Sequence, residues 1–104
     1  MRLAVYKNSF KKQVALMEKR GKSLSDIKDI ISLLMQDIPL AEKNRDHPLS
    51  GNWARFRECH IQPDWLLIYR KDEDANGDIF LYLEATGTHS QRLPVRSLHG
   101  SLRM

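Results

Sequence analysis

The sequence contains a single cysteine, Cys59, so the chain cannot form an internal disulfide bond. A lone cysteine suits a reducing cytoplasm, which is where we expect the protein to be located. Long apolar runs are also missing, since the densest one, Ile30–Met35, is far shorter than the roughly 18 residues of a membrane-spanning helix. No charged segment followed by an apolar stretch opens the chain, so we expect neither a signal peptide nor a membrane partner.

The size and charge of the chain indicate how many domains it has and what kind of partner it binds. Its 104 residues fit one compact domain. Seventeen Lys and Arg residues against thirteen Asp and Glu residues give a formal net charge of +4. A basic balance in so short a chain favours a polyanionic partner, with nucleic acid first among them. On charge alone, a solvated basic surface without such a partner is an equally good interpretation.

The start of the chain predicts a short strand and then a helix. Loose alternation of apolar residues indicates the strand at Arg2–Tyr6. The helix begins at Asn8 or Ser9, either of which could cap it, and Gly21 ends it. Its apolar positions recur at helical spacing, at Phe10, Val14 and Met17.

A second helix is expected from Ser23 or Ser25 to a point before Pro39. Asp26 near its start favours the helix dipole. Its apolar face is formed by Ile27, Ile30, Ile31 and Leu34. We expect the two helices to form an antiparallel hairpin joined by a tight turn, which covers a sheet.

The second half of the chain has the two-residue period of strands. The polar segment Leu40–Asn52 is expected to be a loop, and Asp74–Asp78 contains the Asn-Gly pair of a hairpin turn. Three strands are expected: Trp53–His60, Trp65–Arg70 and Ile79–Thr86, the last of them ended by Gly87. The predicted fold class is therefore α+β, with a helix hairpin packed on an antiparallel sheet that ends in a three-stranded meander.

Three histidines fall where loops meet strands: His47, His60 and His89. Such loop ends can converge at one side of a meander, and Asp64 follows His60 closely enough to orient its imidazole. Because imidazoles titrate near neutral pH, a pair of them can take a proton from one oxygen and give one to another. Each histidine alone is more often a surface residue, so the constellation carries the hypothesis of a metal-free ribonuclease.

Basic and aromatic residues near these histidines are candidate contacts for RNA. Arg55 and Arg57 are predicted to project from one side of a strand and to stabilise a charged transition state. Trp53 and Trp65 begin strands, where an aromatic ring either packs in the core or stacks on a base.

A metal site is the competing chemistry. His47, His60, His89 and Asp64 are ligand types that zinc accepts, and Cys59 adjoins His60. Their spacings match no compact metal-binding signature, and adjacent strand residues face opposite sides of a sheet. We therefore expect no metal.

Three segments together closely resemble the YafQ branch of the RelE-type toxins. Asp46–Trp53 reads DHPLSGNW, His60–Tyr69 reads HIQPDWLLIY, and Thr86–His89 reads TGTH. Their order and spacing fit across roughly residues 1–93, which we expect to be one domain with a RelE-like fold. Residues 94–104 are then a C-terminal extension, which we expect to be partly mobile.

The resemblance implies the toxin of a type II toxin–antitoxin system. Such a toxin enters the ribosomal A site and cuts the exposed mRNA codon without a cofactor. The mRNA 2′-hydroxyl attacks the adjacent phosphate and leaves a 2′,3′-cyclic phosphate and a 5′-hydroxyl, which inhibits translation. The implied partners are a cognate antitoxin, the ribosome with its mRNA and ribosomal RNA, and operator DNA bound through the antitoxin.

The resemblance also assigns residues. The acid–base and positioning set corresponds to His47, His60, Asp64 and His89, and Trp65 matches the aromatic residue that follows this aspartate in the family. With the basic residues that could contact RNA, the expected binding set is Arg55, Arg57, Trp65 and Arg92.

Two positions depart from the family pattern. Many relatives have a basic residue where this chain has Ala85, and an aromatic residue where it has Leu93. The first departure supports an alternative function, a module of the same fold that binds the ribosome or the antitoxin but cuts weakly. Arg55, Arg57 or Arg92 could instead supply the missing charge.

Overall fold

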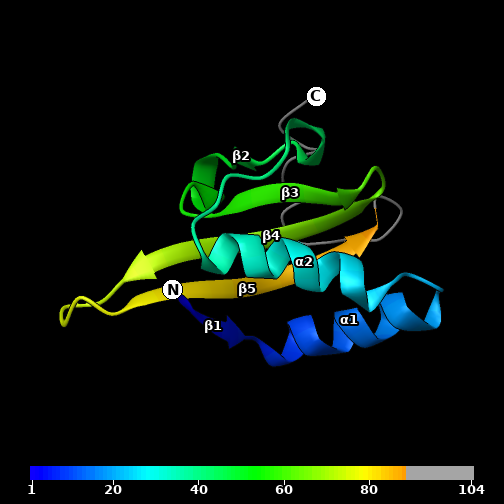
Figure 1. The fold of residues 1–104 in the computed structure, drawn as a ribbon, viewed down its shortest axis with the longest axis horizontal. Coiled ribbons are helices and arrows are strands. Elements are labelled where there is room, and N and C mark those ends of the chain that lie inside the picture. Colours follow the sequence, from blue (N-terminus) through cyan, green and yellow to red (C-terminus); the bar gives the residue numbers. More distant parts are fainter. Residues whose placement is uncertain (89–104) are drawn as a thin grey trace.

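The strand expected near the N-terminus forms at Leu3–Tyr6 (β1), but its pairing differs from the prediction. The computed structural model, which describes residues 1–88, has a five-stranded sheet with the order β1-β5-β4-β3-β2 (Figure 1). β1 runs parallel to β5 (Ile79–Thr88), whereas the other pairs are antiparallel. The sheet is mixed because two helices connect β1 to the meander, and a crossover of that length permits parallel pairing.

Both predicted helices form and lie on one face of the sheet (Figure 1). They are α1 (Asn8–Lys19) and α2 (Leu24–Met35). The predicted side-chain cap of α1 is absent, because Lys7 occupies the cap position without a side-chain hydrogen bond. Gly21 adopts a φ of +88°, a left-handed conformation that ends α1 and starts the tight turn as predicted.

The main core lies between the helices and the sheet. Phe10 and Met17 of α1 and the apolar face of α2 pack against alternate residues of the central strands. On the strands, this cluster includes Cys59, Trp65, Leu67, Tyr69, Leu81 and Leu83. A smaller cluster on the opposite face combines Leu49, Ile68 and Ala85 with the partly buried Trp53 and Phe56. Within residues 1–88, the helices α1 and α2 therefore cover one face of the sheet, and η2 with its neighbouring loops packs on the other.

The strands of the second half differ from the prediction at their ends. The segment predicted as a strand from Trp53 is a 3-10 helix, η2 (Gly51–Trp53), followed by a turn, so β3 spans only Arg57–Gln62. Gly51 has a φ of +62°, which an extended strand cannot accommodate. β4 is Trp65–Glu73. β5 continues through Gly87, because the backbone of Gly87 pairs with Leu66.

The loop expected before the meander contains two short elements. These are a 3-10 helix, η1 (Glu42–Asn44), and a two-residue strand, β2 (His47–Pro48). β2 is antiparallel to β3, so it extends the sheet by one strand at the edge opposite β1. No helix among residues 1–88 is long and apolar enough to cross a membrane.

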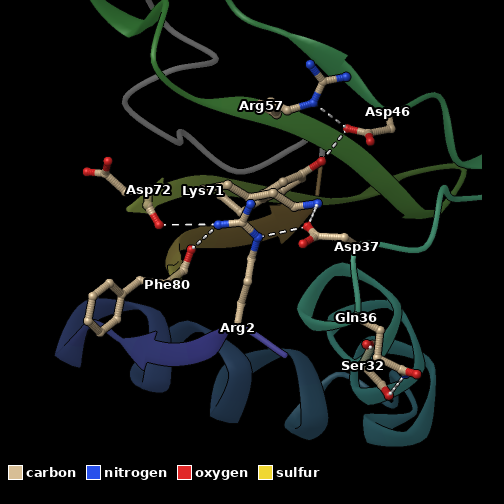
Figure 2. Close-up of polar contacts among 10 residues, drawn as sticks. Arg2, Ser32, Gln36, Asp37, Asp46, Arg57, Lys71, Asp72 and Phe80 are labelled. Atoms are coloured by element: carbon tan, nitrogen blue, oxygen red, sulfur yellow. Dashed lines mark hydrogen bonds and ion pairs between the residues drawn. The ribbon is translucent and has the colours of Figure 1, made fainter. Parts of the chain in front are cut away.

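An ionic cluster joins the N-terminus to distant elements (Figure 2). The Arg2 guanidinium donates from Nε to Asp37 Oδ1 at 2.8 Å and from one terminal nitrogen to the carbonyls of Asp72 and Phe80, both at 3.2 Å. Lys71 Nζ donates to the same oxygen of Asp37 at 2.8 Å. These contacts join β1, the segment after α2, and the hairpin formed by β4 and β5.

Candidate functional site

Two of the predicted histidines lie on the sheet face that the helices leave uncovered. Cys59 points into the helix-side core, so its strand neighbours Glu58 and His60 point to the opposite face, as the two-residue period predicts. His47 on β2 pairs with Glu58 across the edge of the sheet. His60 follows Glu58 by two residues on the same face, roughly 7 Å along the strand.

The imidazole of His47 is held on two sides. Its Nδ1 lies 2.6 Å from the carbonyl oxygen of Arg45, and because a carbonyl can only accept, Nδ1 is the donor. Arg45 has a φ of +49°, an uncommon conformation for a residue with a side chain, which turns this carbonyl toward the ring. The Nε2 atom of His47 lies 3.4 Å from Oε1 of the buried Glu58.

The imidazole of His60 is also fixed through Nδ1. This nitrogen lies 3.1 Å from the carbonyl oxygen of Pro63, so it too carries a hydrogen. The backbone is held as well, because the buried Asn44 donates from Nδ2 to the carbonyl of His60 at 2.7 Å. In both histidines, the neutral ring therefore has its hydrogen on Nδ1 and its lone pair on Nε2.

Asp64 does not have the role that the sequence suggested. It lies in the turn between β3 and β4 with 62% of its side chain exposed, and its Oδ1 is 3.4 Å from Lys22 Nζ. Nδ1 of His60 is instead fixed by the backbone carbonyl of Pro63, the residue before Asp64. Asp64 is thus a solvent-facing carboxylate near the site.

Arg57 points away from the histidines. It precedes Glu58 on β3, so it faces the helix side of the sheet, where its Nε donates to Asp46 Oδ1 at 3.1 Å. The hydroxyl of the buried Tyr69 donates to the same oxygen at 2.5 Å. Figure 2 shows the carboxylate of Asp46 directed at Arg57. The expected contact of Arg57 with RNA beside the histidines does not fit this placement, and the pair instead anchors the segment that ends in His47.

Arg55 does not share a strand with Arg57. It lies in the turn between η2 and β3, where 72% of its side chain is exposed and one terminal nitrogen lies 3.3 Å from Asp72. Asp72 also accepts from Arg70 at 2.6 Å, and the Arg70 guanidinium stacks 4.0 Å from the ring centre of Tyr82. Because its side chain is exposed, Arg55 remains a candidate contact for a phosphate.

Trp65 is unavailable to a nucleotide base. Its side chain is completely buried in the helix-side core, and its indole Nε1 donates to Thr86 Oγ1 at 2.9 Å. The Thr86 hydroxyl in turn donates to the carbonyl of Leu66 at 2.6 Å. The prediction that Trp65 binds RNA is wrong, and its role is to fasten β4 to β5.

The end of β5 lies level with His60. His60 pairs with Leu66, and Leu66 pairs with Gly87, so these backbones form one row across three strands. The described end of β5 therefore lies in the same row as His60, and the convergence of the histidines with His89 stays a prediction. His89, Arg92 and the extension at 94–104 lie outside the described residues.

A family model described as a bacterial toxin of type II toxin–antitoxin system, YafQ, matches residues 2–93. The chain belongs to the YafQ toxin family. The mRNA interferase toxin YafQ of Escherichia coli K12 is 38% identical over 86 residues, which cover 82% of this chain and 88% of that protein. Family membership also confirms the predicted fold, two helices packed on one sheet, apart from the parallel pairing of β1.

Solved structures of bacterial toxins superimpose closely on the chain. A copper-bound mutant toxin from Helicobacter pylori has a TM-score of 0.80 and 34% identity, covering 89% of this chain and all of that one. The Escherichia coli DinJ–YafQ toxin–antitoxin complex has a TM-score of 0.74 and 37% identity, covering 86% of this chain and 93% of that one. In the part of this chain that the structure describes, no three His, Cys, Asp or Glu residues gather closely enough to hold a metal ion.

The sequence reasoning missed two acidic residues of this YafQ-like site, Asp46 and Glu58. Glu58 could have been found, because it stands two residues before His60 and so shares its face of a strand. For Asp46, the only signal in the sequence was its position next to His47. Its partner Tyr69 is 23 residues away in the sequence, and no local pattern connects them.

Proposed function

We propose that this YafQ-family toxin cuts mRNA in the ribosomal A site by acid–base catalysis that uses its own side chains. The chain is an mRNA interferase toxin of a type II toxin–antitoxin system. The observation that carries the proposal is the matched geometry of His47 and His60. Both lie on the sheet face opposite the helices, and in each a backbone carbonyl accepts a hydrogen bond from Nδ1, so the neutral ring has its lone pair on Nε2.

The proposed reaction needs two proton transfers. Nε2 of His47 or His60 accepts the proton of a 2′-hydroxyl, whose oxygen attacks the neighbouring phosphorus. The bond from phosphorus to the 5′-oxygen breaks, and a general acid protonates that oxygen. The products are a 2′,3′-cyclic phosphate and a 5′-hydroxyl, so no water is consumed. We assign the acid role to His89, because the strand that leads to it lies level with His60.

Charged side chains near the histidines support binding of the substrate in this proposal. We propose that Arg55 contacts a phosphate and that Arg92 is a further contact, while Asp64 modulates the charge near His60. The net charge of +4 suits the ribosome, whose RNA is a polyanion. We place the protein in the cytoplasm, where its substrate is translated.

The toxin is expected to have an antitoxin partner. The Escherichia coli relatives have been solved as DinJ–YafQ complexes, in which toxin and antitoxin are bound together. We propose that a cognate antitoxin neutralises this chain as well, and that operator DNA is bound through the antitoxin.

The deciding experiment is primer extension on an mRNA in a reconstituted translation mixture. Wild-type protein should produce discrete cuts only when ribosomes are present. His89→Ala and the double variant His47→Ala/His60→Ala should each cut on the order of 10²–10⁴ times more slowly, which is the usual contribution of a general acid or base. His99→Ala is the matched control and should cut at the wild-type rate.

Three results would contradict the proposal. Cutting of naked mRNA at an equal rate would remove the ribosome from the mechanism. Unchanged cutting by His89→Ala would remove His89 from it. Stoichiometric zinc or copper in the purified active protein, measured by elemental analysis, would replace the metal-free chemistry.

A second candidate is a docking module that binds ribosomes without cutting efficiently. The observation that favours it is the apolar environment of Ala85, which is 6% exposed and packs with Leu49 and Ile68. The resemblance to the family implies a basic residue at this position in many relatives. Binding to ribosomes without cuts in the same assay would select this candidate.

A further inference from the structure

Aromatic rings and an arginine lie side by side on the sheet face opposite the helices. Leu81 and Leu83 of β5 belong to the helix-side core. Phe80 and Tyr82 alternate with them along the strand, so their rings lie on the other face. Arg70 of β4 pairs directly with Tyr82 and shares that face. The hairpin of β4 and β5 thus presents two rings and a guanidinium together.

The arrangement continues into the turn before β3, because the guanidinium of Arg70 lies between two rings. Its Cζ is 4.0 Å from the ring centre of Tyr82 and 5.8 Å from that of Phe56. The rings of Phe80 and Tyr82 are 5.9 Å apart, and those of Trp53 and Phe56 are 5.0 Å apart. Each neighbouring pair is therefore within the range of aromatic or cation–π contact. All five residues are partly exposed, and together they are called the aromatic strip: Phe80, Tyr82, Arg70, Phe56 and Trp53.

The charge beside the aromatic strip is positive. Arg70 and Arg55 both donate to Oδ2 of Asp72, at 2.6 and 3.3 Å. Two guanidinium groups thus share one carboxylate, which leaves one positive charge in excess. Flat rings next to an excess positive charge suit a nucleic-acid strand, whose bases stack on the rings while its phosphates approach the arginines. A duplex keeps its bases stacked inside, so the occupant that fits is single-stranded.

The aromatic strip lies on the same sheet face as His60. On β4, Leu66 pairs with His60, and Arg70 follows Leu66 by four residues, which is roughly 13 Å along the strand. A few nucleotides cover this distance. An RNA strand whose reacting phosphate lies at the histidines can therefore place neighbouring bases on the aromatic strip.

We propose that the aromatic strip is a stacking site for single-stranded RNA, which holds the bases next to the codon that is cut. The inference rests on the proposed ribonuclease function and adds a binding site outside the set of proton-transferring residues. Such a site accepts any base sequence, because every base has a flat face.

The test measures the binding of an RNA strand that cannot be cut. A 2′-O-methyl oligonucleotide of about ten nucleotides lacks the attacking hydroxyl and has a length typical of single-strand sites. Binding should quench the fluorescence of Trp53, since the other tryptophan, Trp65, is completely buried. The same sequence in a duplex, and inorganic polyphosphate, which has no bases, should leave the fluorescence unchanged.

Tyr82→Leu keeps an apolar side chain but removes the flat ring. It should weaken binding of the single strand roughly 5- to 20-fold, the lower part of the range that base–aromatic stacking supplies. Phe80→Leu tests the end of the aromatic strip without altering the ring that contacts Arg70, and it should also weaken binding. Tyr82→Phe keeps the ring and should restore the affinity. Tyr6→Leu is the matched control, because Tyr6 is a 45% exposed tyrosine on β1 outside the aromatic strip, and it should bind as the wild type does.

Urea denaturation shows whether each variant is folded before its affinity is compared. The inference is overturned if the wild-type protein does not bind the single strand, or if Tyr82→Leu and Phe80→Leu bind it as tightly as the wild type. Quenching that persists in Trp53→Phe would come from Trp65 and would also overturn it. Primer extension separates the two proposals. A protein that cuts mRNA without binding the probe has no stacking site, whereas one that binds the probe without cutting has the site and lacks the ribonuclease function.

Discussion

At the scale of single residues, one carboxylate oxygen of Asp46 fixes the backbone next to His47 through two hydrogen bonds. Oδ1 of Asp46 accepts from both Tyr69 and Arg57, and Asp46 is bonded directly to His47 along the chain. Burial, followed by the hydrogen bond to Asp46, raises the pKa of the Tyr69 hydroxyl above its ordinary value. The hydroxyl therefore stays protonated and remains a donor across the physiological range.

Tyr69→Phe tests this anchor, because it removes the hydroxyl and keeps the buried ring. Loss of a hydrogen bond to a charged group should lower the free energy of unfolding by about 1.5–3 kcal/mol, measured by urea denaturation. Tyr82→Phe is the control, since the ring of Tyr82 stacks on Arg70, and it should change stability by less than about 0.5 kcal/mol. Equal effects of the two substitutions would show that the Asp46 contact adds nothing.

The alternation of side chains along a strand predicts which face of the sheet a residue occupies, and such positions could be predicted from the sequence. Alternation correctly separated Cys59 from His60, and the same rule places Arg57 on the face opposite His60. The sequence does not decide whether Trp65 is buried, because its partner Thr86 is 21 residues away. The left-handed Arg45 and its contact with His47 have no signal in the sequence.

At the scale of elements, the ionic cluster around Asp37 fastens the segment after α2 to β4 and to the residue before β1. Asp37 follows α2 with a φ of +56° and accepts hydrogen bonds from Lys71 of β4 and from Arg2 beside β1. The hydrogen bonds from Lys71 and then from Arg2 lower the pKa of Asp37 from 3.8 to about 2. Its ionised form is thus favoured by folding.

This cluster predicts how stability depends on acid. A carboxylate whose pKa is lower in the folded state adds stability above the unfolded pKa, and that stability is lost as the pH falls through the folded pKa. Asp37→Asn, which tolerates the same backbone conformation, should lower stability at pH 5–7. The difference from wild type should shrink between about pH 4 and pH 2 in urea unfolding. The exposed Asp29 of α2 provides the control variant Asp29→Asn, and a difference that did not depend on pH would reject the explanation.

Elements with local signals were predicted well. The apolar spacing of α1 and α2 and the Asn-Gly turn before β5 specified both helices and the hairpin. The parallel pairing of β1 with β5 was not predictable, because it joins residues separated by most of the chain. β2 has only two residues, which is too short for any period to show.

At the scale of the whole molecule, the reactivity of the single cysteine measures how firmly the helices pack on the sheet. Cys59 has no exposed surface and lies between the sheet and the helices. Burial raises the pKa of its thiol above the ordinary value, so little reactive thiolate forms. A thiol reagent also cannot reach the sulfur while the protein is folded.

A thiol reagent should therefore label the folded protein at least about a thousandfold more slowly than the unfolded chain, as expected for a domain of ordinary stability. The rate can be followed by absorbance in buffer and in denaturant. Cys59→Ser serves as the blank for reaction elsewhere. Rapid labelling of the native protein would show that the layers separate easily.

The parallel pairing of the first strand with the last has a consequence for how the toxin is made. β1 is synthesised before the helices and the other strands but cannot pair until residues 79–88 have been translated. α1 also packs on β5, so a nascent chain that stops before this strand lacks the surface that its first helix covers. Such a fragment contains His47 and His60 but cannot complete the sheet that presents them. We therefore expect a chain interrupted before residues 79–88 to be inert as a nuclease.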